Sequence, residues 1–140
     1  MKNKGTIAEF YDARGESRTL LTARDVDDMI DVMLEGKLLG FAAQLYSLER
    51  CTPAGDPDHT FHVGVDPSER TGSLMSADPR EGDDHYYSVG DVTLGQAPVY
   101  YSGEEYPAFS KIPVEEIRQA VKEFVESAGM RPTCIGWETR

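Results

Sequence analysis

The feature that most constrains the fold is a long central region, residues 38–101, where short apolar runs alternate with turn residues and no helical periodicity appears. Pro fixes φ, and Gly and Asp tolerate unusual φ, so residues 52–58, 66–68, 78–84 and 90–91 predict turns. The apolar runs between them predict the strands of an antiparallel meander. These strands are predicted at residues 42–49, 60–65, 72–76, 85–89 and 97–102.

A strand and an amphipathic helix are predicted before this region. Residues 6–11 mix β-branched, aromatic and polar side chains and predict a strand, followed by a turn over 12–16. Thr22 predicts a helix start, since its hydroxyl can accept from free amides and Asp25 follows three residues later. The predicted apolar face holds Val26, Met29, Ile30, Met33 and Leu34, and Gly36 ends the helix. The predicted acidic outer face holds Asp27, Asp28 and Asp31.

A second helix is predicted to start at Pro113, because the missing amide costs nothing in a first turn. Its apolar stripe is Val114, Ile117, Val121, Phe124, Val125 and Ala128. Gly129 and Pro132 end this helix, and residues 133–137 predict a last short strand. Together the elements predict a single α+β domain over residues 1–140, a mostly antiparallel sheet with two amphipathic helices packed on one face.

The charge of the chain limits its partners. Twenty-five acidic residues against 14 basic ones give a net charge of −11. Nucleic-acid binding gains most of its affinity from Lys and Arg on phosphates, so a free nucleic acid is not expected as a partner. A basic protein is favoured instead, although an acidic surface can also serve solubility alone.

The cysteines and the apolar segments indicate where the protein works. Cys51 and Cys134 belong to no disulfide framework or CxxC pattern, and both are expected to be reduced. No segment approaches the roughly 18 consecutive apolar residues of a membrane span, and no apolar run follows the first lysines. These features predict a cytoplasmic protein with no membrane partner.

No pattern of residues predicts an enzyme. His59 and His62 are three residues apart, which places them on opposite faces of a strand, and no third metal ligand accompanies them. His85 follows Asp83 and Asp84 on a predicted loop, where a solvated side chain is expected. The chain has no GxSxG elbow and no Gly-rich phosphate loop, and its cysteines lack activating neighbours. We therefore expect no catalytic residues, no metal and no cofactor.

About 40 residues at the C-terminal end carry a resemblance. They contain the tyrosine-rich run 99–101, a helix that begins after a proline and ends at Gly129, then Arg131-Pro132 and the single tryptophan, Trp137. This arrangement resembles immunity protein family one of bacterial polymorphic toxin systems. The resemblance implies an α+β fold with a characteristic tryptophan, which Trp137 matches. It also implies a protein that blocks a toxin encoded beside it, often a nucleic-acid deaminase.

Two segments combine aromatic rings with carboxylates and are the predicted contact surface for a toxin. The predicted contact residues are Asp83, Asp84, Tyr86, Tyr87, Tyr101, Glu104, Glu105 and Tyr106. Adjacent tyrosines of a strand point to opposite faces, so one of each pair is expected in the core. Trp137 is expected to be structural, because a lone tryptophan after a short strand usually closes a core. A small-ligand-binding or regulatory α+β domain without catalytic activity is the alternative interpretation, and a hydrolase comes third.

Overall fold

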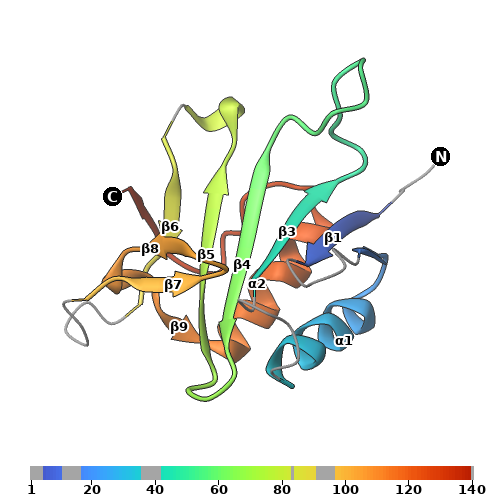
Figure 1. Cartoon of the computed structure of the whole chain (residues 1–140). Helices are drawn as coiled ribbons and strands as arrows, with labels where there is room; N and C mark the ends of the chain where they lie inside the picture. The colour runs from blue at the N-terminus through green and yellow to red at the C-terminus, as the bar shows by residue number, and fades with distance from the viewer. Residues whose placement is uncertain (1–4, 11–16, 36–41, 83, 91–96, 140) are drawn as a thin grey trace.

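A computed structural model describes residues 5–10, 17–35, 42–82, 84–90 and 97–139 of the chain. Two helices lie against one face of a twisted antiparallel sheet, as Figure 1 shows. The predicted α+β class and the packing of both helices on one face are confirmed. The predicted turn over 12–16, Gly36 and Asp83 lie outside the described residues.

Among the described residues, the main sheet has eight strands, seven of them in the order β10-β6-β5-β4-β3-β1-β2, and β9 pairs with β5 at one end. Their bounds are β1 Thr6–Phe10, β2 Ser17–Leu20, β3 Ala42–Ser47, β4 Thr60–Asp66, β5 Thr71–Ala77, β6 Tyr86–Ser88, β9 Ile112–Pro113 and β10 Trp137–Thr139. Two further described strands, β7 Val99–Tyr101 and β8 Glu104–Tyr106, form a separate two-stranded sheet. Each predicted strand of the central meander corresponds to an observed one, with bounds that differ by up to two residues.

Four short strands differ from the prediction. β2, β8 and β9 were not predicted, because each has four residues or fewer and therefore little periodicity. β10 begins at Trp137 instead of ending there, so residues 133–136 form a loop that leads the tryptophan to the sheet. These are edge elements, whose pairing depends on tertiary contacts that a sequence pattern does not report.

Helix α1, Ala23–Leu34, begins as the sequence predicts. The Asp25 amide donates to Thr22 Oγ1 at 3.2 Å, and the Asp25 carboxylate accepts from the Thr22 amide at 3.1 Å. This reciprocal capping box satisfies amides that have no partner inside the helix. Val26, Met29, Ile30 and Met33 are buried, as their spacing predicts.

The predicted outward acidic face of α1 is only partly exposed. Arg118 of α2, Val114–Glu126, lies 3.0 Å from Asp27 and 2.6 Å from Asp31, and Lys122 lies 3.1 Å from Asp27. Asp27 and Asp31 therefore link α1 to α2, and Asp27 is half-buried, while Asp28 and Asp31 are exposed. The start of α2 also differs by one residue, since Pro113 is the N-cap and Val114 the first helical residue.

The hydrophobic core lies between the helices and the sheet. Phe61, Val63 and Val65 of β4 face α1 and α2, and the Phe61 ring stacks on Phe124 of α2 at 4.3 Å. A second, smaller cluster lies on the opposite face of the sheet, under the β7–β8 hairpin. Its buried members are Ala42, Met75, Tyr87, Tyr101 and Tyr106. The two sheet faces are thus covered by different kinds of structure, helices on one and a hairpin on the other.

Candidate functional site

The β7–β8 hairpin is held on the sheet by a close approach to β4. Gly64 leaves room for the Tyr101 ring, since a Cβ atom at residue 64 would lie 2.3 Å from a ring carbon. Glycine inside a strand commonly marks such an approach. In Figure 1 the hairpin crosses in front of β4 and β5, on the side away from the helices.

A buried network of hydroxyl groups fixes this contact. Tyr101 Oη lies 3.2 Å from Ser73 Oγ of β5, and Ser110 Oγ donates to Ser73 Oγ at 2.8 Å. Ser88 Oγ of β6 donates to the Ser110 carbonyl at 2.7 Å and accepts from the Leu74 amide at 2.9 Å. Burial raises the pKa of Tyr101 to about 12, so this hydroxyl keeps its proton. The hairpin is therefore a fixed part of the fold.

Three of the predicted contact tyrosines belong to this inner cluster. The Tyr106 ring meets Tyr87 and Tyr101 edge-on, with centroids 5.8 and 5.1 Å apart, and all three are buried. The expectation that their rings offer surface area is corrected, because the cluster leaves them no exposed face. Their place is beneath the hairpin, where they support the residues at its surface.

Tyr100 takes the surface position instead. It is 59% exposed, whereas Tyr101 is 3% exposed, so the two neighbours point to opposite sides as strand geometry predicts. Tyr100 Oη donates to Glu105 Oε1 at 3.1 Å across the hairpin. Alternation alone does not say which tyrosine of a pair is buried. The contact with Gly64 decides it, and no local signal in the sequence pairs residue 64 with residue 101.

The carboxylates of the hairpin lie at its surface. Glu104 and Glu105 are exposed, and Glu104 Oε1 lies 3.3 Å from Nδ1 of His62 on β4. Burial lowers the pKa of His62, and the neighbouring Glu104 opposes this shift. We call Tyr100, Glu104 and Glu105 the hairpin tip. It presents an aromatic ring and two carboxylates from a rigid support.

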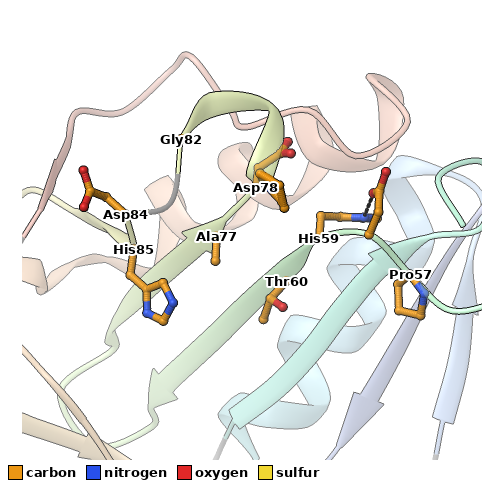
Figure 2. A pocket seen from close by; sticks show the side chains of 10 residues that line it. Pro57, His59, Thr60, Ala77, Asp78, Gly82, Asp84 and His85 are labelled. Atoms are coloured by element: carbon orange, nitrogen blue, oxygen red, sulfur yellow. Dashed lines mark hydrogen bonds and ion pairs between the residues drawn. The ribbon is translucent and has the colours of Figure 1, made fainter. Parts of the chain in front are cut away.

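The second predicted segment lies beside a cleft of about 360 Å³ between the ends of β4 and β5. Asp84 and His85 are exposed at its rim, across from His59 and Pro57 in Figure 2. Tyr86 is half-buried under the Arg131 guanidinium, whose carbon lies 4.1 Å from the ring centroid. Among the described residues of this segment, Asp84 is therefore the one predicted contact residue that is both charged and exposed.

Residues 14–139 match a protein family described as Immunity protein Imm1. The chain belongs to this family. Membership implies that the protein neutralises a cognate toxin, and immunity proteins are typically non-catalytic inhibitors. None of the curated proteins compared with the chain matches it.

The histidines of this Imm1 protein have structural surroundings. The Ser47 amide donates to His59 Nε2 at 2.9 Å, which leaves the ring proton on Nδ1, 3.0 Å from Asp58 Oδ1. Burial lowers the pKa of His59 and favours this neutral form. His62 lies on the other sheet face, as the spacing predicts. Within the described residues, His, Cys, Asp and Glu side chains form no group that could hold a metal ion.

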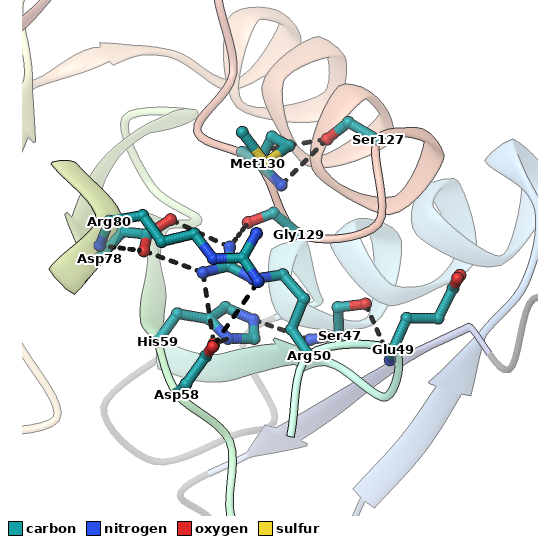
Figure 3. Close-up of polar contacts among 10 residues, drawn as sticks. All are labelled: Ser47, Glu49, Arg50, Asp58, His59, Asp78, Arg80, Ser127, Gly129 and Met130. Carbon is teal, nitrogen blue, oxygen red and sulfur yellow. Dashed lines mark hydrogen bonds and ion pairs between the residues drawn. The ribbon is translucent and has the colours of Figure 1, made fainter. Parts of the chain in front are cut away.

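A buried ion pair joins three distant parts of the Imm1 fold. Arg50 is 5% exposed and donates to both carboxylate oxygens of Asp78, at 2.9 and 2.8 Å, and to the Gly129 carbonyl at 2.6 Å. Asp58 lies 3.2 Å from the same guanidinium. Figure 3 shows Arg50 between β5, the segment before β4 and the end of α2. We call these four residues the Arg50 cluster, and its contacts indicate a structural role.

Trp137 also packs within the fold. Trp137 is half-buried against the main core, and its ring lies edge-on to Phe61 with centroids 6.3 Å apart. Its indole N–H donates to the Pro132 carbonyl at 2.7 Å, which closes the loop between α2 and β10. Cys51 and Cys134 are both free and exposed. No helix of the described segments is long and apolar enough to cross a membrane.

Proposed function

We propose that this immunity protein neutralises a nucleic-acid deaminase toxin by covering the toxin's basic substrate groove with the hairpin tip and Asp84. The observation that carries the proposal is the exposed pair Glu104 and Glu105 beside Tyr100, on a hairpin fixed to the sheet by Tyr101. A rigid acidic projection suits a groove that otherwise binds phosphates.

The side chains of the hairpin tip suit both fast association with the toxin and slow dissociation from it. Complementary charge steers the two proteins together and raises the association rate constant toward about 10⁸ to 10⁹ M⁻¹s⁻¹ at low salt. A slow dissociation rate then requires an aromatic side chain that buries its surface in the partner. Tyr100 is the exposed ring nearest to the two carboxylates, and its hydrogen bond to Glu105 limits the entropy that it loses on binding.

The test is a growth assay in which the toxin domain encoded beside this chain is induced with and without the immunity protein. Rescue of growth and co-purification as a 1:1 complex support the proposal. A deaminase assay with the purified toxin on single-stranded nucleic acid then tests the chemistry, since inhibition must rise with added immunity protein. Growth arrest with abundant folded immunity protein would contradict the proposal and favour a small-ligand-binding domain.

A further inference from the structure

The sheet face opposite the helices is only partly occupied by the described residues. The hairpin and its cluster lie over Ala42, Gly64 and Met75, toward β5 and β6. Toward β1 the same face continues without a described element above it, as the right side of the sheet in Figure 1 shows. Alternation along β1, β3 and β4 assigns the following side chains to this part, the open sheet face: Ile7, Glu9, Gln44, Tyr46, Thr60 and His62.

The strand register makes these side chains neighbours. Ile7 pairs with Tyr46, Glu9 with Gln44, and Gln44 with His62 across adjacent strands. Directly opposed residues have Cβ atoms about 5 Å apart, so the six side chains form one continuous surface. Glu9 is exposed and the other five are half-buried. The surface thus has partly covered rings and one fully accessible carboxylate.

Within the described strands β1, β3 and β4, the charged side chains have one sign. β1, β3 and β4 contain no lysine or arginine, so these strands contribute carboxylates without basic residues of their own. Glu9 acts on Tyr46, whose pKa is raised first by burial and second by this carboxylate. At its border, His62 contacts Glu104 of the hairpin tip. The open sheet face and the hairpin tip therefore form one acidic surface.

The side chains at the centre have the chemistry of a binding surface for basic residues. Glu9 is an acceptor only, the half-buried Tyr46 has an acceptor oxygen, and a tyrosine ring can stack with a guanidinium. Aromatic residues surrounded by a polar rim commonly supply most of the affinity of an interface. The hairpin tip alone is a narrow projection, and a stable complex needs about 800 Å² on each partner.

We propose that the toxin also docks on the open sheet face, placing a surface rich in arginine and lysine against Glu9, Tyr46 and Glu104. This inference rests on the proposed function, because it extends the hairpin tip into a larger interface with the same toxin. It assigns Tyr46 of β3 as a central anchor and Glu9 of β1 as an acceptor for a basic side chain, beyond the border where Glu104 meets His62.

The test compares toxin binding by titration calorimetry for the full-length immunity protein and three variants. Glu9→Lys reverses charge on the open sheet face, and Tyr46→Ala removes the ring. Glu126→Lys is the matched control, because it makes the same charge change at an exposed position on the helical side. We expect Glu9→Lys and Tyr46→Ala each to weaken binding by roughly tenfold or more, and Glu126→Lys by about threefold or less.

Each outcome decides between the two proposals. If Glu9→Lys and Tyr46→Ala bind the toxin as tightly as the original protein does, docking on the open sheet face is overturned. The hairpin-tip proposal is left standing by that result. No binding by the original protein would reject the proposed function itself. Glu9 is exposed, so its variant is expected to fold, and a wild-type Tm for Glu9→Lys keeps the test valid even if Tyr46→Ala is unstable.

Discussion

The ring of Tyr101 lies directly over Gly64, so that a Cβ atom at residue 64 would stand 2.3 Å from the ring Cγ. Real side chains do not approach so closely, and therefore any residue larger than glycine must push the β7–β8 hairpin away from β4. We expect Gly64→Ala to lower the free energy of unfolding by about 1–3 kcal/mol, as overpacking in a core does. Thermal and denaturant unfolding measure this loss, and hydrogen exchange of residues 99–106 shows whether the hairpin loosens.

Gly136→Ala is the control for this prediction. The nearest atom to a Cβ at residue 136 is Val89 Cβ at 3.6 Å, an ordinary contact, so the variant should be close to wild-type in stability. Equal unfolding free energies for both alanine variants would contradict the role assigned to Gly64.

Charge reversal at Glu104 and Glu105 together should slow association with the toxin. The two carboxylates are exposed, so their loss acts on the encounter step and leaves the fold intact. Stopped-flow association at several salt concentrations should show a lower rate and a weaker dependence on salt. Kinetics identical to wild-type would remove both residues from the interface.

Truncation of Trp137 should affect stability more than binding. Its ring packs against Phe61 and its indole N–H holds the loop at Pro132, so Trp137→Ala should lower the unfolding free energy by about 3 kcal/mol. Chemical denaturation measures the loss, and toxin affinity is measured below the unfolding transition. A large loss of affinity with unchanged stability would instead place Trp137 in the interface.

Removal of Arg50 should be strongly destabilising. Arg50→Met leaves Asp78 buried without its guanidinium partner, which typically costs about 3–5 kcal/mol. The double variant Arg50→Met with Asp78→Asn removes both charges and should recover part of this loss. If the double variant is as unstable as the single one, the uncompensated charge is not the cause.

Acid should destabilise the fold through His62. Burial lowers its pKa in the folded state, so the unfolded chain binds protons more readily and stability falls as the pH drops below about 6.5. His62→Gln should reduce the decline of Tm between roughly pH 6.5 and 5. His59 has a lowered pKa as well, so part of the decline should remain in this variant. An unchanged decline would show that His62 is not responsible.

The sequence predicts the long elements well because their signals are local. Thr22 and Asp25 form the capping box that their spacing implies, and the apolar residues of α1 face the core. The central strands follow from turn residues and short apolar runs. The alternation rule also separates Tyr100 from Tyr101, since it depends only on backbone geometry.

The tertiary contacts could not be predicted in the same way. The burial of Tyr101 depends on Gly64, 37 positions earlier, and Asp27 is half-buried because Arg118 of another helix pairs with it. The open sheet face appears only when β1, β3 and β4 are brought into register, because no single segment carries its pattern. A local sequence pattern does not identify the residues that pack against a side chain in the fold. Those residues decide whether a tyrosine or a carboxylate reaches the surface.

The Arg50 cluster has a consequence for how soon a newly made molecule can act. Arg50 and Gly129 are 79 positions apart, so their hydrogen bond forms only after most of the chain has left the ribosome. Closing so long a loop is entropically costly before other contacts repay it, and such pairings slow folding. We therefore expect a newly made molecule to complete the Arg50 cluster, which ties the end of β5 to the end of α2, only late in folding.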